Sequence, residues 1–509
     1  MRLLSFLAIF LIFIQSEALA KAPINDEGAE KVKSIVQKIL NEQKEANSST
    51  NRKFITDGEI QVEKASTYYA VTLPDISVVT TNRKKEESKS STTKIGIMGL
   101  NISPTENPKE WNVAIAIPTP LKRLDDNQTP SISIDIGHQQ MSGTWNEDLG
   151  AFSKLNGQYS DILISEENDA SQTKIKELRI KTTVSSDDQR LWSGPSNIQI
   201  SGITFENING EERTPIIEVG GVDITSSVRD YSPYTRDKLT HILNSIKNKL
   251  DKEDASTATP LMLPMLDIID SGAFKITLNN LKISPEVNKL TNAPITIQEA
   301  FVGLGINGLK ERMVGHNLSF GWHGLTGAKS PIKDNNVIPT TASFSLNLDK
   351  LPLHPLITLI TQVSDKESNI AQMAGMNTMM SLPQKLSQAG TTITIENTVL
   401  KHPSYMFDLN GHIKASEKSI LGSKGQATVR SVGIDNVIKL LEKQRPGATQ
   451  KKLLEINYMI RNLNALKRIS VNDPNNNDVK TATFVLNDKG QTLVNGVPLQ
   501  EAFNGAPAQ

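Results

Sequence analysis

The chain has 509 residues, its 55 lysine and arginine residues balance 55 aspartate and glutamate residues, and it contains no cysteine. A formally neutral chain lacks the basic character of nucleic-acid-binding proteins, and a chain without cysteine can form neither a disulfide bond nor an acylated lipoprotein terminus. The length suffices for two or three domains, or for one sheet structure that grows along the chain.

The first twenty residues have the pattern of a secretory signal peptide. Arg2 supplies a positive charge, residues 3–14 are almost wholly apolar, and Ala18 and Ala20 are the small residues that signal peptidase requires. The apolar run at about 1.5 Å per residue falls well short of a hydrocarbon core of about 30 Å, which disfavours a membrane anchor. We therefore expect cleavage after Ala20 and a periplasmic mature protein. We expect no transmembrane segment after that cleavage, because no later run holds eighteen consecutive apolar residues.

The mature chain is predicted to begin with an amphipathic helix. Its apolar residues recur at helical spacing between lysines and glutamates: Val32, Ile35, Val36, Ile39 and Leu40. The polar face mixes both charges and lacks an aromatic residue, which favours packing on a following sheet over binding to a membrane surface.

After this helix the period changes to two, which is typical of antiparallel strands. The strands predicted in the first half cover residues 59–63, 69–73, 94–97, 111–117, 131–136, 161–165, 177–184, 198–205 and 217–219. We predict turns at Asn156-Gly157, Gly194-Pro195 and Asn209-Gly210. The charged run 82–93 is predicted to be a solvated hairpin loop. A basic patch for anionic headgroups is the alternative, although glutamates cancel much of its charge.

A domain boundary is predicted near the middle of the chain. An apolar stripe from Tyr234 to Leu250 predicts a helix, and the polar run 251–257 follows it. We place an N-terminal helix-plus-sheet domain at 21–255 and a C-terminal α+β domain at 256–509. Residues 100–104 (LNISP) and 281–285 (LKISP) echo each other, so a duplicated sheet module is one interpretation.

The second half combines further strands with helices. A strand is predicted at 274–278, an apolar helix at 353–360, and a meander at 389–432 that leads into a helix capped by Asp435. Another stripe starts near Thr449, and the chain closes with a hairpin at 481–499. Four methionines recur at helical spacing before the meander: Met373, Met376, Met379 and Met380. They either fill core gaps or line an adaptable ligand site beside the sheet.

Residue patterns that carry catalytic or metal chemistry were sought without success. His316 and His323 are the closest histidine pair, but Gly315, Gly321 and Gly324 exclude the helix that would bring them together. The glycines of residues 303–308 do not fit a dinucleotide loop, so we interpret them as a twisted strand and a bend. We assign no catalytic, cofactor or metal residue and expect a protein that is not an enzyme.

Four segments carry a resemblance to known families: 386–397, 408–413, 423–429 and 484–499. The first three resemble an alphaproteobacterial envelope family of unknown function whose members carry a signal peptide and repeated strand modules. The last is similar to the C-terminus of YdgA-like envelope proteins. These resemblances imply a periplasmic β-rich protein, loosely similar to the AsmA-like proteins that handle lipid. The chain departs from YdgA-like and AsmA-like proteins in its cleavable N-terminus, which questions direct membrane attachment.

Together these patterns predict a mainly β protein with helices (α+β), built of elongated, twisted antiparallel sheets backed by amphipathic helices. The predicted strands outnumber the helices that can cover them. We therefore expect a non-catalytic binding or envelope-maintenance protein that holds lipid or another apolar ligand on a concave sheet face. The alternative is an envelope scaffold that binds another protein through sheet edges or loops and takes no small ligand.

Overall fold

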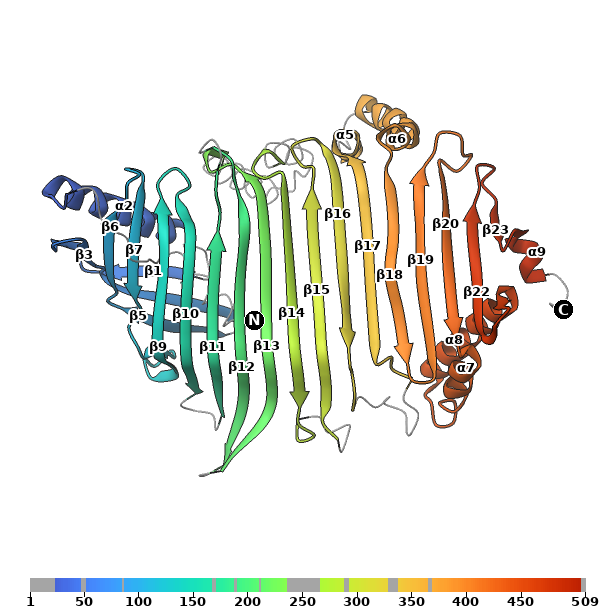
Figure 1. Cartoon of the computed structure of the whole chain (residues 1–509), viewed down its shortest axis with the longest axis horizontal. Coiled ribbons are helices and arrows are strands. Elements are labelled where there is room, and N and C mark those ends of the chain that lie inside the picture. Colours follow the sequence, from blue (N-terminus) through green and yellow to red (C-terminus); the bar gives the residue numbers. More distant parts are fainter. Residues whose placement is uncertain are drawn as a thin grey trace. The chain divides into compact units, whose positions relative to one another are not determined.

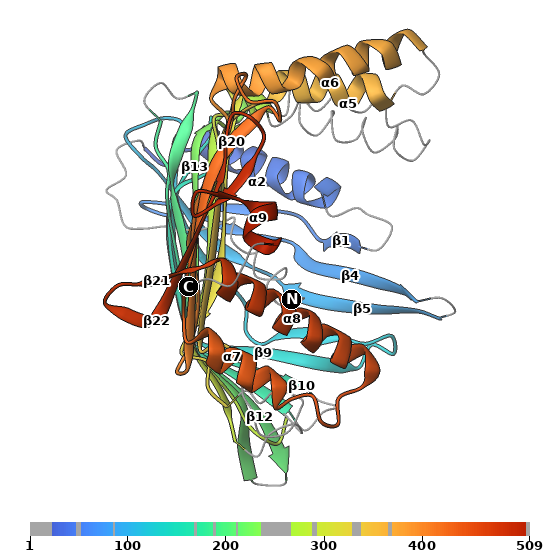
Figure 2. The ribbon, with the colours of Figure 1, turned by 90° about the vertical axis from the view of Figure 1, so that its right-hand side faces the viewer.

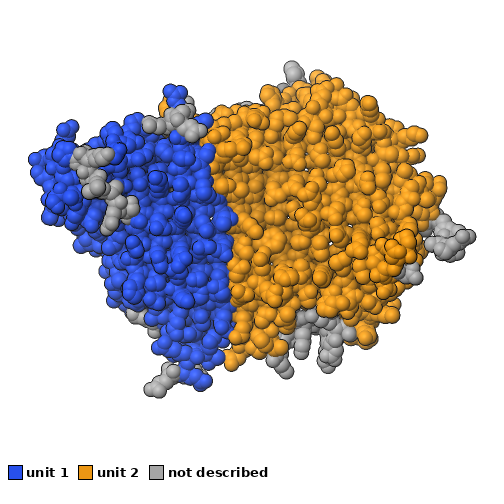
Figure 3. All heavy atoms as spheres, in the orientation of Figure 1, with its two compact units in different colours: residues 1–226 blue, residues 227–509 orange. Residues whose placement is uncertain are grey.

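The computed structural model describes residues 23–46, 52–84, 87–166, 171–186, 190–209, 212–235, 266–287, 293–327, 337–364 and 369–504. Antiparallel strands dominate, and helices accompany them, which confirms the predicted fold class. The chain forms two compact units, residues 1–226 and 227–509 (Figure 3). The predicted signal peptide, the boundary at 255 and, beyond Thr235, the predicted helix from Tyr234 lie outside the described residues, so these stay predictions.

Unit 1 holds one described helix and a series of strands. They are α2 (Asp26–Ala46), β1 (Arg52–Asp57), β2 (Gln61–Lys64), β3 (Tyr69–Thr72), β4 (Asp75–Lys84), β5 (Glu87–Gly96), β6 (Gly99–Pro104), β7 (Glu110–Ala116), β8 (Leu121–Leu124), β9 (Pro130–Asn146), β10 (Ala151–Glu166), β11 (Ser171–Thr183) and β12 (Trp192–Asn209). Strand β13 (Glu212–Tyr231) runs across the boundary between the units.

The sheet of unit 1 divides at the long strand β9. One edge of β9 pairs with β10 along its length, and β11 and β12 follow in antiparallel order. The other edge pairs with β7 near Asn146 and with β8 near Ile134. One branch continues from β7 through β6 and β3 to β2, and the other continues from β8 through β5 and β4 to β1. Figure 1 shows β1 and β5 crossing the direction of β10 and β11.

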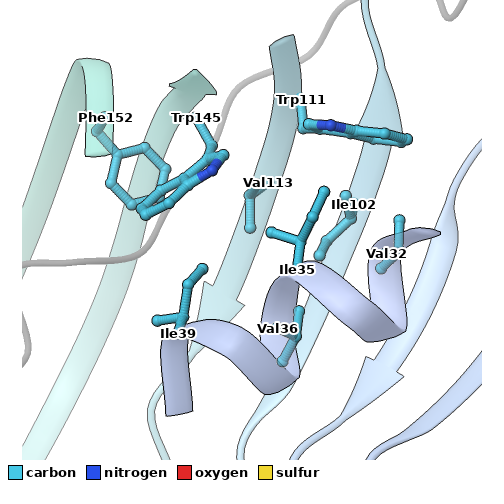
Figure 4. Close-up of a pocket in the computed structure, with 9 residues that line it drawn as sticks. All are labelled: Val32, Ile35, Val36, Ile39, Ile102, Trp111, Val113, Trp145 and Phe152. Carbon is cyan, nitrogen blue, oxygen red and sulfur yellow. The ribbon is translucent and has the colours of Figure 1, made fainter. Parts of the chain in front are cut away.

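The core of unit 1 is closed because α2 lies against both branches. Val32 and Val36 on the predicted apolar stripe are buried among side chains of β3, β6 and β7, so the predicted packing of this helix on the sheet is confirmed. Trp145 and Phe152 meet edge to face with their ring centroids 5.2 Å apart. A gap of about 20 Å³ lies between α2 and the sheet (Figure 4). It is apolar and has room for about one water molecule, so it holds no ligand.

Three predictions in unit 1 are wrong because glycine and charge were interpreted as turn or loop signals. Asn156-Gly157 lies inside β10, where a Cβ on Gly157 would be 2.9 Å from Cγ of Met141. Gly194-Pro195 lies inside β12, where a Cβ on Gly194 would be 2.0 Å from the Thr183 carbonyl oxygen. Both glycines permit close approach of a neighbouring strand. The charged run 82–93 forms paired strands up to Lys84 and from Glu87, so only residues 85–86 separate the strands of this hairpin.

Unit 2 continues with strands and adds helices. They are β14 (Ser271–Ile283), β15 (Ile295–Asn307), β16 (Met313–His323), β17 (Thr341–Pro352), α5 (Leu353–Ser364), α6 (Asn369–Ala389), β18 (Thr392–His402), β19 (Tyr405–Ala415), β20 (Ser423–Val432), α7 (Ile434–Glu442), α8 (Gln450–Ile469), β21 (Val471–Asp473), β22 (Asn476–Leu486), β23 (Thr492–Val494), β24 (Val497–Pro498) and α9 (Leu499–Asn504). The predicted meander is confirmed as β18, β19 and β20, and the final hairpin as β22 and β23.

The sheet of unit 2 is a consecutive antiparallel series. Each strand from β14 to β20 pairs with the next, and β22 pairs with β20. The described helices of this unit project from the same face of the sheet, α5 and α6 at one end of the strands and α7 and α8 toward the other (Figure 2). This placement leaves the middle of that face without a helix.

Two details of these helices differ from the predictions. The N-cap of α7 is Gly433 in the left-handed conformation, at φ 67°, and Asp435 lies in the first turn, where its carboxylate pairs with Lys467 at 2.6 Å. Glycine adopts that φ freely and the helix therefore starts without a side-chain cap. The four methionines of α6 are 61–81% exposed, so they do not fill core gaps.

Candidate ligand-binding surface

The strand register of unit 2 separates apolar from polar side chains. Directly paired residues of antiparallel strands point to the same face, and alternate residues of one strand point to opposite faces. Phe274 pairs with Leu304, Leu304 with Leu318, Leu318 with Leu346, and Leu346 with Ile395. These residues form one apolar row that crosses β14 to β18.

Three parallel rows lie on the same face. Their members are Ile276, Val302, Phe320 and Phe344; Leu278, Ala300, Trp322, Ala342, Leu400 and Phe407; and Ile306, His316, Leu348, Ile393 and Ile413. The rings of Phe320 and Phe344 lie 5.1 Å apart. We call the surface formed by these rows the open face. No residue in the rows has a formal charge when histidine is neutral.

The opposite face of these strands is polar. It carries Asn317, Ser319, Ser345, Asn347, Thr394 and His412. The side-chain amides of Asn317 and Asn347 are hydrogen-bonded across β16 and β17. This sheet is therefore amphipathic, as the period of two predicts.

The open face is accessible to solvent. Seven of its large apolar side chains are 40–50% exposed: Phe274, Val302, Leu304, Phe320, Ile393, Leu400 and Ile413. If a large apolar side chain has roughly 200 Å² of surface, these seven expose on the order of 500 Å². Patches of this size on monomeric proteins are often functional. The expectation of more apolar sheet surface than the helices cover is met in unit 2.

Helices limit the open face toward the C-terminal strands. Tyr405 is buried, and Phe407 packs with it against Val437, Ile438 and Leu441 of α7, and against α8. Phe484 and Ala482 of β22 pack against α8 and α9. The helix α6 lies against β17 and β19 at the other strand end. The exposed area therefore extends mainly over β14 to β18.

Two titratable rings lie at this limit. His402 stacks on Tyr405 with their centroids 4.8 Å apart, and the Tyr405 hydroxyl donates to the Val337 carbonyl oxygen. Burial raises the pKa of Tyr405 to about 12 and lowers the pKa of His402. Both rings are therefore neutral at pH 7, and this border is apolar in character.

The histidine pair singled out by the sequence does not come together. His316 and His323 lie on β16 seven positions apart and so point to opposite faces. His316 Nδ1 lies 2.9 Å from the Gly305 carbonyl oxygen, and His323 Nδ1 lies 2.9 Å from the Thr341 hydroxyl. In the part of the chain that the structure describes, no three His, Asp or Glu side chains are grouped to hold a metal ion.

Residues 303–308 form the end of β15 and a bend, as predicted. Gly308 has φ of 69°, and a Cβ there would be 2.2 Å from the Met313 carbonyl oxygen. This glycine is therefore required by the backbone geometry of the bend. The sequence did not identify the open face residue by residue, although the alternation in β14 to β17 was the available signal.

None of the protein-family models scanned and none of the curated proteins searched matches this chain. Of the described helices, none combines the length and apolar character needed to span a bilayer.

Proposed function

We propose that this chain is a non-catalytic, periplasmic binding protein whose open face takes the acyl chains of lipid. The observation that carries this proposal is the uninterrupted apolar surface of four rows, seven of whose side chains are 40–50% exposed. A surface of this kind has no hydrogen bond or charge with which to select a polar ligand. It therefore favours a ligand that is itself apolar over most of its length.

Size and energy are compatible with such a ligand. Six strands spaced about 4.8 Å apart give a width of roughly 24 Å from β14 to β19. A lipid chain occupies half of a hydrocarbon core of about 30 Å, so it fits across these strands. Covering on the order of 500 Å² of apolar surface contributes about 12 kcal/mol before the costs of association are subtracted.

The periplasmic location rests on the predicted signal peptide and not on the described structure. Export would bring the protein between two membranes, where chains of lipid are available. The exposed methionines of α6 supply adaptable apolar contacts at one end of the strands.

Solvent extraction tests the proposal. The protein is purified from cells without detergent, extracted with chloroform and methanol, and the extract is examined by mass spectrometry. Acyl-chain lipid at close to one molecule per chain is the expected result, and an extract free of lipid would contradict the proposal.

The scaffold alternative predicts a different outcome. A partner protein would cover the same face, and the purified chain would then migrate as a stable complex or oligomer in size exclusion with light scattering. A lipid-free extract together with such a complex would favour the scaffold. The exposed rows favour the lipid proposal, since a scaffold acting through sheet edges or loops does not require an uncovered apolar face.

A further inference from the structure

Unit 1 contains a polar cavity that is separate from the open face. Its volume is about 560 Å³, within the range of roughly 300–1,000 Å³ that small-molecule sites occupy. Side chains of β7, β9 and β10 line it, together with the segments 105–107 and 184–186 and the first residue of β12. Hydroxyl and amide groups dominate this lining.

Two buried nitrogen atoms of the lining have no hydrogen-bond partner. They are Nδ2 of Asn112 and Nε1 of Trp192, and each of these residues is only 4% exposed. The Asn112 amide oxygen already accepts a hydrogen bond from the Thr144 hydroxyl at 3.3 Å. An unpaired buried donor costs about 1–3 kcal/mol, and an indole nitrogen can only donate. The cavity therefore offers two donors to a ligand that brings acceptors.

Other tryptophans of the chain show that such a donor is normally paired. Trp111 Nε1 donates to Glu147 Oε1 at 2.7 Å, and Trp322 Nε1 donates to the Pro339 carbonyl oxygen at 3.0 Å. Both of these indoles are partly buried, as is usual for tryptophan with a polar partner. Trp192 differs because its nitrogen lies at the cavity without such a partner.

The charges of the lining indicate a neutral ligand. Glu106, Glu110 and Lys154 line the cavity, so carboxylates exceed ammonium groups by one. Glu110 Oε1 accepts from Asn146 Nδ2 at 3.1 Å. An anionic ligand would satisfy the two donors but would face the carboxylates. A hydroxyl can accept from a nitrogen donor and donate to a carboxylate at the same time.

We propose that this cavity binds a neutral saccharide. Adjacent hydroxyl groups of such a ligand would accept hydrogen bonds from Asn112 and Trp192 and donate to the Glu110 carboxylate. The buried position of Trp192 makes its N–H, and not its ring face, the group that the ligand uses. This site is independent of the open face, so neither proposal depends on the other.

Isothermal titration calorimetry of the full mature chain tests the proposal. The probes are cellobiose, maltose and N,N′-diacetylchitobiose, with glycylglycine and citrate as zwitterionic and anionic comparisons. We expect at least one of the neutral saccharides to bind. We expect Trp192→Phe and Asn112→Leu each to weaken that binding by about tenfold or more, because each removes one donor.

Matched variants separate loss of the site from loss of the fold. Trp322→Phe and Asn101→Leu change the same residue types away from the cavity, and we expect them to bind the saccharide as the parent chain does. Asn112→Leu breaks no hydrogen bond of Nδ2, so its thermal midpoint by circular dichroism should stay close to that of Asn101→Leu. No binding of any saccharide at about 10 mM, binding only of glycylglycine or citrate, or equal losses in the control variants would overturn the proposal.

Discussion

Units 1 and 2 use the same alternation of apolar and polar residues, yet they treat the apolar face differently. In unit 1 the row that contains Tyr159 and Leu178 is buried, and burial raises the pKa of Tyr159. In unit 2 the rows that contain Leu304 and Phe320 are exposed to solvent. A period of two therefore defines which residues share a face but does not determine whether that face is covered.

The difference arises from the elements that pack on each sheet. In unit 1, β9 pairs with two branches, and these strands and α2 enclose the apolar side chains. In unit 2 the described helices lie toward the ends of the strands and on the C-terminal strands. The strands β14 to β18 receive no comparable cover. Stability should therefore depend on apolar contacts in unit 1, and binding should depend on them in unit 2.

The largest expected effect comes from truncating one leucine in each unit. Leu100 of β6 is 2% exposed, so Leu100→Ala should lower the free energy of unfolding of unit 1 by about 3 kcal/mol. Leu304→Ala on the open face should cost unit 2 less than about 1 kcal/mol. Urea unfolding followed by tryptophan fluorescence measures both, since Trp111 and Trp145 report on unit 1 and Trp322 on unit 2. Equal costs would show that the two faces are equally buried.

Methionine oxidation should differ by about tenfold or more between the units, because sulfoxide formation follows exposure. Met373 and Met380 of α6 are exposed, whereas Met98 and Met141 of unit 1 are buried. Brief treatment with hydrogen peroxide followed by peptide mass mapping gives the rates. Protection of the α6 methionines in the purified protein would mean that another molecule covers them.

The fold class, the meander and the amphipathic α2 could be predicted because each depends on local periodicity. The branching at β9 could not, since pairing of β7 and β8 with different parts of one strand depends on distant residues. The glycines at 157 and 194 were misinterpreted because close approach of a neighbouring strand has the same sequence signal as a turn. The cavity near Trp192 escaped notice because its lining comes from segments that are far apart in the sequence.

A smaller effect is expected at the ion pair of Arg229 and Asp270 in unit 2. Burial disfavours the Asp270 carboxylate, but the hydrogen bonds from Arg229 outweigh it and lower the Asp270 pKa. Asp270→Asn should destabilise unit 2 by about 1–2 kcal/mol, toward the low end because Arg229 is well exposed. Because the folded pKa is below the unfolded value, this stabilisation is full above pH 3.8 and is lost as the pH falls further. Urea midpoints of parent and variant that converge at low pH would agree; parallel curves would not.

The smallest effect is expected from His402 at the limit of the open face. Burial lowers its pKa, so its contribution to stability is full above the ordinary histidine pKa of 6.5 and declines as the pH falls below it. We expect a loss of less than about 1 kcal/mol, because the ring is only partly removed from water. Comparing the pH dependence of the urea midpoint in the parent and His402→Gln measures this. A parent curve that is flat relative to the variant would contradict the neutral stacked ring.

Titration of cis-parinaric acid into two variants of neighbouring residues on β16 tests the open face most directly. Phe320→Asp places a charge on the open face, whereas Ser319→Asp places the same charge on the polar face of the same strand. We predict that the parent and Ser319→Asp bind the fluorescent fatty acid alike and that Phe320→Asp binds it at least about tenfold more weakly. No binding by the parent, or equal weakening by both variants, would contradict a ligand-binding role for this face.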